Sequence, residues 1–375
     1  MKESILTAAV IGAGMIANKA HIPAYLSMPD KVRLEAISDV SGESAQWAAQ
    51  QNGIPHWYTD AANMLREVQP DLVSVCTPNM YHATFIRMVL EHGANVLCEK
   101  PLAMTWRETK GLFDLAKAKG KMLMACQTMR YGDDYLAARE LAQSGILGKV
   151  YYAEFAAIRR RGIPKWGVFH RKEANGGGCL CDLGVHMIDA ALWLMDTPKF
   201  EAVCGSSASY IAHSESNVTS SLAESGAPAG VIAAREYKPE EFEVEEFAAG
   251  TVRFQGGLSM NFKTSWALNL PPQFNLSLAG TKAGLSLPDL KLYSTLGRYQ
   301  TDITPRVFRD ERYAQQPFSG HFHLVRNAAD HLLSGEECMV TPEQTLAVSM
   351  IIDAFYLSAA QNREVLAEEI LSAPQ

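Results

Sequence analysis

The sequence has no excess of positive charge and no long apolar run. Its 34 Lys and Arg residues are outnumbered by 41 Asp and Glu residues, which gives a formal net charge of −7. Nucleic-acid-binding surfaces are basic, so nucleic acid is not an expected partner. The roughly 18 unbroken apolar residues of a membrane span are absent. Lys2 stands beside Glu3 and glycines interrupt the first apolar run, so we expect no secretory signal, no membrane partner and a cytoplasmic protein.

Cysteine is too sparse and too irregularly spaced for a disulfide framework. The chain has seven cysteines among 375 residues, whereas disulfide frameworks are typical of short secreted chains. Cys179 and Cys181 form one C-x-C pair without a second pair of ligands at a spacing typical of zinc. We therefore expect no metal and interpret the cysteines as small buried thiols, with metal binding at the C-x-C pair as the alternative.

Glycine and proline occur at ordinary frequencies, 27 and 17 residues respectively, which excludes collagen-like and disordered classes. A length of 375 residues predicts two domains, each with its own core. The stretch Ser206–Ala234 is rich in Ser, Ala and Gly and has weak periodicity. We interpret it as irregular connections in the second domain.

The first third of the chain alternates short apolar runs with helical stretches, which is typical of a parallel sheet with crossover helices. Ser41 and Asp60 are predicted to begin two of the helices. Thr105 with Glu108 forms a capping box for a third helix, which Gly120 ends. The apolar runs predicted to be strands are Ile5–Ile11, Leu34–Ile37, Leu72–Cys76, Val96–Cys98 and Met122–Cys126.

The pattern changes to strands from about Lys149. Tyr151–Ile158 alternates in the manner of a strand, and Thr251–Phe254 and Leu258–Trp266 flank a turn signal at 255–257. The spacing is too short for helical crossovers, so we expect an antiparallel or mixed sheet. Two C-terminal helices are predicted at Phe322–Leu333 and Pro342–Ala360.

A glycine-rich motif follows the first predicted strand. Residues 12–17 have the pattern G-x-G-x-x-A, in which the glycines allow a tight turn and the close approach of a pyrophosphate to a helix N-terminus. Asp39 follows the next apolar run, 22 positions after Ala17, near the roughly 20 expected for the acid that binds a ribose. The pattern predicts a dinucleotide site, and the alternative is a structural glycine turn. The predicted cofactor-binding residues here are Gly12, Gly14, Met15, Ile16 and Asp39.

Asp39 also favours NAD over NADP as the cofactor. A carboxylate repels a 2′-phosphate, and the neighbouring Val40 supplies no compensating cation.

Three further motifs carry polar side chains that suit a site. The segment CTPNMYH at 76–82 and the segment CEKP at 98–101 each follow a predicted strand, where the ligand crevice of a parallel sheet lies. The third, GGGCLCDLGVHMID at 176–189, places Asp182 and His186 four positions apart. On a helix these two side chains share one face.

These three motifs, with AVIGAGMIA at the start, make the sequence similar to the Gfo/Idh/MocA oxidoreductase family, the relatives of glucose–fructose oxidoreductase and inositol dehydrogenase. The resemblance implies an α/β fold, with an N-terminal Rossmann domain and a C-terminal α/β domain built on a large, mostly antiparallel open sheet. We expect residues 1–127 to bind the dinucleotide and residues 128–375 to bind substrate, with the last helices packing back on the first domain. The open sheet is expected to form a homodimer or homotetramer.

The resemblance also implies which residues form the site. The implied catalytic residues are Lys100, Asp182 and His186. The implied cofactor-lining residues of the second and third motifs are Thr77, Pro78, Asn79, His82, Glu99 and Lys100. Members of the family often have a cis peptide bond before the proline of E-K-P, which is Pro101 here.

The chemistry of alcohol oxidation fits these residues. Oxidising a secondary alcohol removes a hydride from carbon, which the nicotinamide takes, and a proton from oxygen, which a positioned base takes. Histidine side chains ordinarily titrate near neutrality, which suits His186 as the base, while Lys100 is a cation that polarises the oxygen. Asp182 is expected to orient the imidazole or to hold a second hydroxyl. The alternative is a surface lysine and a buried helix histidine.

The substrate is less well defined by the sequence. The segment 159–169 carries several cations and Trp166, which suit a sugar ring or an acidic substituent, and the alternative is a basic loop or a subunit contact. The resemblance points to a sugar, a sugar derivative or a cyclitol. Two other functions stay open: NAD-dependent cleavage of a glycoside by transient oxidation and elimination, and non-catalytic NAD sensing. The candidate substrate residues are Arg130, Tyr131, Trp166 and His170.

Overall fold

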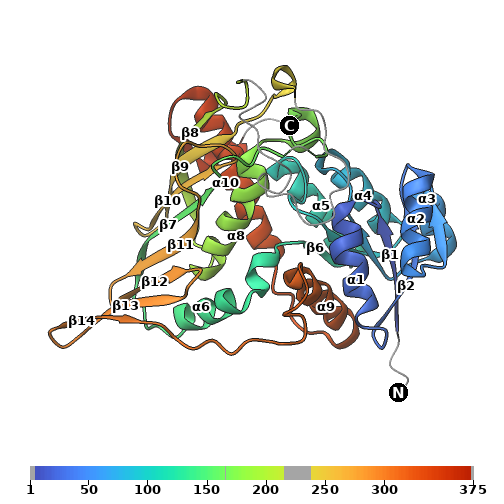
Figure 1. Ribbon diagram of the computed structural model, residues 1–375, viewed down its shortest axis with the longest axis horizontal. Coiled ribbons are helices and arrows are strands. Elements are labelled where there is room, and N and C mark those ends of the chain that lie inside the picture. Colours follow the sequence, from blue (N-terminus) through green and yellow to red (C-terminus); the bar gives the residue numbers. More distant parts are fainter. Residues whose placement is uncertain (1–4, 165, 215–237, 373–375) are drawn as a thin grey trace. The chain divides into compact units, whose positions relative to one another are not determined.

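A computed structural model describes residues 5–164, 166–214 and 238–372 of the chain (Figure 1). The chain divides into two compact units, and each unit combines two separate segments. Unit 1 comprises Met1–Tyr131 and Asp310–Thr345, and unit 2 comprises Gly132–Arg309 and Leu346–Gln375.

Unit 1 contains a six-stranded parallel sheet, drawn mostly in blue and teal in Figure 1. Its strand order is β3-β2-β1-β4-β5-β6. The chain runs outward from β1 first to one side and then to the other, so the carboxyl ends of β1 and β4 form the topological switch point at which such sheets bind ligands. The predicted Rossmann domain is confirmed. The strands are β1 (Leu6–Ile11), β2 (Val32–Ser38), β3 (His56–Tyr58), β4 (Leu72–Val75), β5 (Asn95–Cys98) and β6 (Leu123–Ala125).

The predicted helix starts in unit 1 are also confirmed. Ser41 Oγ accepts a hydrogen bond from Ser44 N, Asp60 Oδ1 accepts one from Ala62 N, and Thr105 Oγ1 accepts one from Glu108 N. Strand β3 was not predicted, because it is three residues long and has no alternation of buried and exposed side chains. The helices are α1 (Ile22–Leu26), α2 (Gly42–Asn52), α3 (Ala61–Val68), α4 (His82–Glu91) and α5 (Trp106–Lys119).

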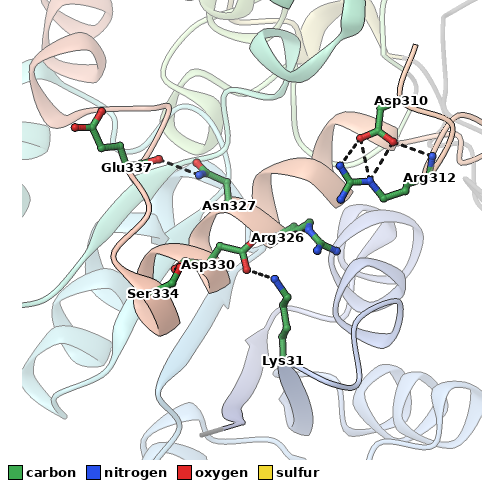
Figure 2. A network of polar contacts seen from close by, with 8 residues as sticks. All are labelled: Lys31, Asp310, Arg312, Arg326, Asn327, Asp330, Ser334 and Glu337. Atoms are coloured by element: carbon green, nitrogen blue, oxygen red, sulfur yellow. Dashed lines mark hydrogen bonds and ion pairs between the residues drawn. The ribbon is translucent and has the colours of Figure 1, made fainter. Parts of the chain in front are cut away.

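Helix α9 (Ser319–Ser334) belongs to unit 1 although it comes late in the sequence. It packs against α1 and against the turn Thr128–Tyr131. Figure 2 shows Asp330 of α9 paired with Lys31, and Asn327 Nδ2 donating to Glu337 O at 3.0 Å. The helix therefore forms part of the unit that contains the parallel sheet.

Unit 2 is built on a nine-stranded sheet of order β14-β13-β12-β11-β7-β10-β9-β8-β15. Strands β7 and β10 pair in parallel and the other neighbours are antiparallel, so the predicted mostly antiparallel sheet is confirmed. The predicted turn at 255–257 joins β9 to β10. The strands are β7 (Val150–Ile158), β8 (Phe200–Ala208), β9 (Phe247–Phe254), β10 (Ser259–Ser265), β11 (Gln273–Gly280), β12 (Ala283–Leu287), β13 (Lys291–Leu296), β14 (Tyr299–Ile303) and β15 (Val365–Leu366).

Aromatic side chains between the sheet and its helices form the core of unit 2. Phe262 stacks on Phe155 at 5.3 Å between ring centroids and meets Phe355 of α10 at 5.5 Å. Among the described residues, one helical stretch, Lys172–Leu194, is long and apolar enough to cross a membrane, and 83% of its most apolar window is buried, as in a core helix. The helices are α6 (Asp133–Gln143), α7 (Lys172–Asn175), α8 (Val185–Leu194), α10 (Pro342–Gln361) and α11 (Ala367–Ser372).

Two expectations about local structure need correction. The stretch Ser206–Ala234 is not irregular at its start, because Ser206–Ala208 completes β8 and pairs with β9; residues 215–237 lie outside the described part of the chain. The seven cysteines form no disulfide within the described residues. Five are buried as expected, but Cys338 is half-buried and Cys204 is exposed on β8.

Candidate active site

The glycine-rich loop after β1 has the backbone shape that a pyrophosphate-binding turn requires. Gly12 has a φ of +97°, and a Cβ there would lie 2.6 Å from Cys76 O, the carbonyl that follows β4. Nothing lies within 4 Å of a Cβ built on Gly14, which is exposed. Asn18, not identified from the sequence, ties the loop together because its Nδ2 donates to Ala13 O and Gly14 O. Glycine is thus required at the close contact, and open space lies beside the second glycine.

Asp39 follows β2 and lies against the same loop. Its Oδ2 accepts a hydrogen bond from Ala13 N at 2.7 Å, and its Oδ1 accepts one from Ser41 N at 2.8 Å. The side chain is half-buried, and Val40 beside it is 90% exposed. Binding of ribose hydroxyls by this carboxylate stays a prediction, and the exposed valine adds no cation for a 2′-phosphate.

The loop after β4 contributes an open hydrogen-bonding group and a structural histidine. Thr77 Oγ1 is buried and has no hydrogen-bond partner among the described residues. His82 is fully buried, and its two ring nitrogens lie 2.8 Å from Thr77 O and Pro101 O. Burial lowers the pKa of His82 despite these contacts. The imidazole therefore joins the β4 and β5 loops, and its predicted contact with the cofactor stays a prediction.

Glu99 at the end of β5 is the centre of a buried polar cluster. Its Oε1 lies 3.0 Å from His21 Nε2 and 3.0 Å from His321 Nε2. On the other side of the ring, His21 Nδ1 forms a hydrogen bond with Ser74 Oγ at 2.9 Å, and Ser74 Oγ also forms one with Tyr25 OH at 2.7 Å. We call these five residues the Glu99 cluster. Cys126 Sγ lies within 4.8 Å of the nearest nitrogen of His21 and oxygen of Glu99, and a hydrogen bond joins those last two atoms.

The charge state of the Glu99 cluster follows from its contacts. Burial alone would raise the pKa of Glu99, but hydrogen bonds from His21 and His321 outweigh burial and hold its pKa well below the ordinary value. Burial lowers the pKa of His21, and the contact with Glu99 opposes that shift only in part. An ionised Glu99 therefore accepts a hydrogen bond from Nε2–H of a neutral His21. In this tautomer His21 Nδ1 carries no proton and accepts a hydrogen bond from the Ser74 hydroxyl.

Lys100 follows Glu99 and is half-buried. Its backbone N–H donates to Glu99 Oε2 at 3.3 Å, and the Lys100–Pro101 peptide bond is cis. The carboxylate that binds the two histidines therefore also fixes the backbone of the predicted catalytic lysine.

Asp182 and His186 lie in unit 2 on a π-helical turn, Leu180–Gly184, that continues into α8. Such turns are frequent at functional sites because they widen the helix locally. Between Cys179 and Leu194 only Asp182, Leu183 and His186 are partly exposed. The predicted shared face is therefore the accessible side of an otherwise buried helix.

Glu245, at the entry to β9, fixes the loop that leads into this helix. Its Oε2 accepts from Gly178 N at 2.9 Å, and its Oε1 accepts from Leu180 N at 3.0 Å and from Tyr356 OH at 2.9 Å. Burial raises the pKa of Glu245, and these hydrogen bonds oppose that rise. A Cβ on Gly178 would lie 1.9 Å from Glu245 O, so glycine is required for this close approach. The sequence did not identify Glu245 as a site residue, because its hydrogen-bond partners are distant in the chain. Leu180 and Gly178 come 65 and 67 positions before it, and Tyr356 comes 111 positions after it.

The candidate substrate residues in unit 1 have their side chains engaged by the C-terminal segment. Arg130 is fully buried and donates from Nη1 to Met339 O at 2.9 Å and to Gln344 Oε1. Tyr131 OH donates to Asn327 Oδ1 at 2.9 Å. These contacts attach the turn after β6 to α9 and to the segment that follows α9, and a role in substrate binding stays a prediction.

The candidate substrate residues in unit 2 lie in the segment before α7. Trp166 is half-buried and meets Phe169 edge-on at 6.0 Å. His170 is 5% exposed and its Nε2 lies 3.8 Å from Glu241 Oε2. Neither contact tests the predicted role in binding a sugar.

A hollow of about 370 Å³ lies beside the helix that carries Asp182 and His186. Leu183 forms part of its wall, between Asp182 and Gly184 in the chain, and Phe274 of β11 is 51% exposed. Most of the wall is apolar, with polar groups at Arg159 and Gln273. Small-molecule sites usually have this composition, with a mostly apolar wall and a few polar groups.

The fold and the glycine loop define a dinucleotide-binding α/β protein of the Rossmann type. A sequence profile described as "Oxidoreductase family, NAD-binding Rossmann fold" matches residues 6–127, and the GFO/IDH/MocA C-terminal domain matches residues 135–286. The chain belongs to the Gfo/Idh/MocA oxidoreductase family and is an NAD-dependent oxidoreductase.

Relatives and solved structures agree with this membership over nearly the full chain. D-glucoside 3-dehydrogenase of Escherichia coli (strain K12) is 33% identical over 368 residues, which cover 97% of this chain and 98% of the relative. A levoglucosan dehydrogenase in complex with NADH superposes with a TM-score of 0.80 at 20% identity, over 97% of this chain and 99% of that one. An aldose-aldose oxidoreductase from Caulobacter crescentus superposes with a TM-score of 0.76 at 22% identity, over 97% and 100%. The two structures support the fold.

Proposed function

We propose that the chain oxidises a secondary hydroxyl of a sugar or sugar derivative with NAD, and that a D-glucoside is the substrate to test first. The observation that carries the proposal is the pair Asp182 and His186, which are partly exposed together on a helix where, from Cys179 to Leu194, every other side chain except Leu183 is buried. Nearly full-length similarity to a D-glucoside 3-dehydrogenase supports the choice of a glucoside.

The cofactor side of the site fits NAD by its own geometry. The space beside Gly14, the carboxylate of Asp39 and the open Thr77 Oγ1 suit a pyrophosphate, a ribose and a further polar group of the cofactor. NAD would be held by these residues together with Gly12, Met15, Ile16, Pro78 and Asn79. When bound, NAD supplies the hydride acceptor.

The protein groups then handle the proton and the charge on oxygen. In our proposal the His186 imidazole accepts the proton of the substrate hydroxyl, because its ordinary pKa lies near neutrality. The Lys100 ammonium donates a hydrogen bond from Nζ to the same oxygen and stabilises the charge that develops on it. The Asp182 carboxylate orients the imidazole or holds a neighbouring hydroxyl.

The test is NADH formation with a panel of D-glucosides, free aldoses, sugar acids and cyclitols such as inositol. His186→Ala and Lys100→Ala are expected to lower kcat by about 10²- to 10⁴-fold, the usual contribution of a general base or of charge stabilisation. His92→Ala, a change on the exposed end of α4, is the matched control. Full activity in the His186 or Lys100 variant would overturn the assignment. Release of the aglycone without NADH accumulation would point to glycoside cleavage, and NAD binding without turnover of any substrate would point to a sensor.

We also propose how the cofactor-binding and substrate-binding roles divide along the chain, and that the chain forms a homo-oligomer. Residues 1–127 would carry the cofactor and residues 128–375 the substrate groups and the oligomer interface, in a cytoplasmic homodimer or homotetramer. Support for an interface comes from the polar side chains on one face of the unit 2 sheet, where Tyr152 OH donates to Glu154 Oε2 and accepts from Asn261 Nδ2. Light scattering on the purified protein tests the assembly, and a monomer at micromolar concentration would contradict it.

A further inference from the structure

Trp266 directly follows β10, and its side chain is completely buried. A buried indole N–H needs a hydrogen-bond acceptor, because an unpaired donor away from water is unfavourable. The Nε1–H donates to Asp182 Oδ2 at 3.0 Å. The two residues are 84 positions apart, and no sequence motif connects them.

The backbone of Trp266 is held by hydrogen bonds on both sides, and its indole packs against a neighbouring ring. Its backbone N–H donates to Glu246 O at 2.8 Å, and its carbonyl accepts from Gly162 N at 2.6 Å. The indole also meets Phe242 edge-on, at 6.3 Å between ring centroids and an interplanar angle of 82°. Turning the indole away from Asp182 would break its contact with Phe242.

Glu246 contributes to this rigidity with its side chain as well. Its carboxylate accepts the backbone N–H groups of Tyr210, Ile211 and Ala212, so the residue whose carbonyl holds Trp266 is itself anchored. Glu245 beside it holds Gly178 and Leu180 by their N–H groups. The Asp182 segment is therefore fixed at its backbone by Glu245 and at its carboxylate by Trp266.

We propose that Trp266 is a positioning residue for the reaction: its indole N–H sets the orientation of the Asp182 carboxylate toward the substrate or His186. This inference rests on the proposed function, because it needs Asp182 in the catalytic group. Asp182 is half-buried, so its carboxylate is partly accessible while one of its oxygens accepts from the indole. Because a hydrogen bond to a charged acceptor is stronger than one between neutral groups, loss of the indole N–H removes a strong constraint on the orientation of the carboxylate.

The experiment is a double-mutant cycle of Trp266→Phe and Asp182→Asn on the full-length protein with NAD and the best substrate of the panel. Phenylalanine keeps an aromatic ring and removes the donor. We expect Trp266→Phe alone to lower kcat by about ten- to a hundredfold with little change in the KM for NAD. In the Asp182→Asn background the same change should alter kcat less than about threefold, because the carboxylate that it orients is absent.

A merely structural role for Trp266 gives a different pattern. Its effect on kcat would then be the same in both backgrounds, which would overturn the proposal, as would wild-type kcat in Trp266→Phe while Asp182→Asn is impaired. Full activity of Asp182→Asn would instead overturn the proposed catalytic role of Asp182. Trp106→Phe is the control, since Trp106 is also a buried tryptophan, in α5 of unit 1, and it should leave kcat unchanged.

A spectroscopic measurement keeps the test independent of how well Trp266→Phe folds. The indole Nε1–H resonance of Trp266, assigned in folded Asp182→Asn by comparison with wild type, should move upfield because a carboxylate acceptor has become a neutral amide. An unchanged resonance would overturn the contact on which the proposal rests.

Discussion

His321 Nε2 lies 3.0 Å from Glu99 Oε1 although the two residues are 222 positions apart. This contact attaches α9 to the end of β5, next to the predicted catalytic Lys100. The same oxygen contacts His21, so one buried carboxylate holds two segments of unit 1 together. Its removal should therefore affect both the stability of the unit and the loop that contains Lys100.

Replacing Glu99 by Ala is expected to lower the free energy of unfolding by about 3–5 kcal/mol, the usual effect of removing one partner of a buried charged contact. The cause is the loss of the acceptor for both His21 and His321. Urea unfolding at pH 7 measures the change. Glu91→Ala, on the exposed end of α4, should lie within about 0.5 kcal/mol of wild type, and an equal effect of the two variants would contradict the prediction.

The Glu99 cluster should also determine part of the pH dependence of the free energy of unfolding. The folded-state pKa of Glu99 is well below its ordinary value of 4.5, so its contribution is present above pH 4.5 and is lost as the pH falls further. The pKa of His21 is below 6.5 in the folded state because of burial, so the unfolded chain binds that proton first and stability also falls below pH 6.5. Urea unfolding from pH 8 to 3 should show both decreases. Glu99→Gln should lack the lower one, and an unchanged profile in that variant would be contrary to this account.

Asp39→Ala should reduce the preference for NAD over NADP. The carboxylate that repels a 2′-phosphate is lost, and so are its hydrogen bonds to Ala13 N and Ser41 N. The ratio of kcat/KM for NAD to that for NADP is expected to fall by at least about tenfold. Asp60→Ala is the matched control, because this N-cap of α3 contributes about 1 kcal/mol to stability and is not part of the predicted cofactor site. A wild-type ratio in Asp39→Ala would remove the role of Asp39 in cofactor choice.

Gly178→Ala should displace the loop that carries Asp182, because its Cβ would lie 1.9 Å from Glu245 O. We expect a loss of about 1–3 kcal/mol in stability and a lower kcat. Gly111→Ala, inside α5 with nothing within 4 Å of the new Cβ, should be neutral or stabilising by up to about 1 kcal/mol. Thermal unfolding and steady-state kinetics on both variants test this. A Gly178→Ala protein with wild-type stability and wild-type kcat would contradict the prediction, because the loop would then accommodate the Cβ by a small movement.

Phe274→Ala should raise the KM for a glucoside if the hollow beside Leu183 receives part of the substrate. The half-exposed ring forms part of the wall of that hollow, and its loss removes apolar contact area. We expect the KM for an aryl glucoside to rise more than the KM for free glucose, with the KM for NAD unchanged. Tyr299→Ala, an exposed aromatic residue on β14, is the control. Equal KM values for the aryl glucoside in Phe274→Ala and wild type would place the substrate elsewhere.

The features that the sequence predicted depend on neighbouring residues. Ser41, Asp60 and Thr105 begin helices through hydrogen bonds to residues two or three positions later, and the glycine loop needs only a strand before it and a helix after it. Both kinds of signal lie within one short window of sequence.

The features that the sequence did not predict depend on distant partners. The contacts of Glu245, Trp266 and His321 are with residues 65 to 222 positions away. The local sequence around each of them predicts a strand or a helix and nothing about these contacts. Glu245 and Glu246 resemble surface acids in the sequence, yet both are buried because backbone N–H groups surround them.

The position of α9 in unit 1 also sets the order in which the protein can be completed during synthesis. The strands of the parallel sheet emerge from the ribosome first, but His321 is added after all of the unit 2 strands except β15. Until then Glu99 has one of its two histidines, and Arg130 and Tyr131 have no acceptors from the C-terminal segment. A nascent chain that ends before residue 310 therefore exposes the surface that α9 covers, and the unit whose translation begins first is completed only after nearly all of the unit 2 strands have been made.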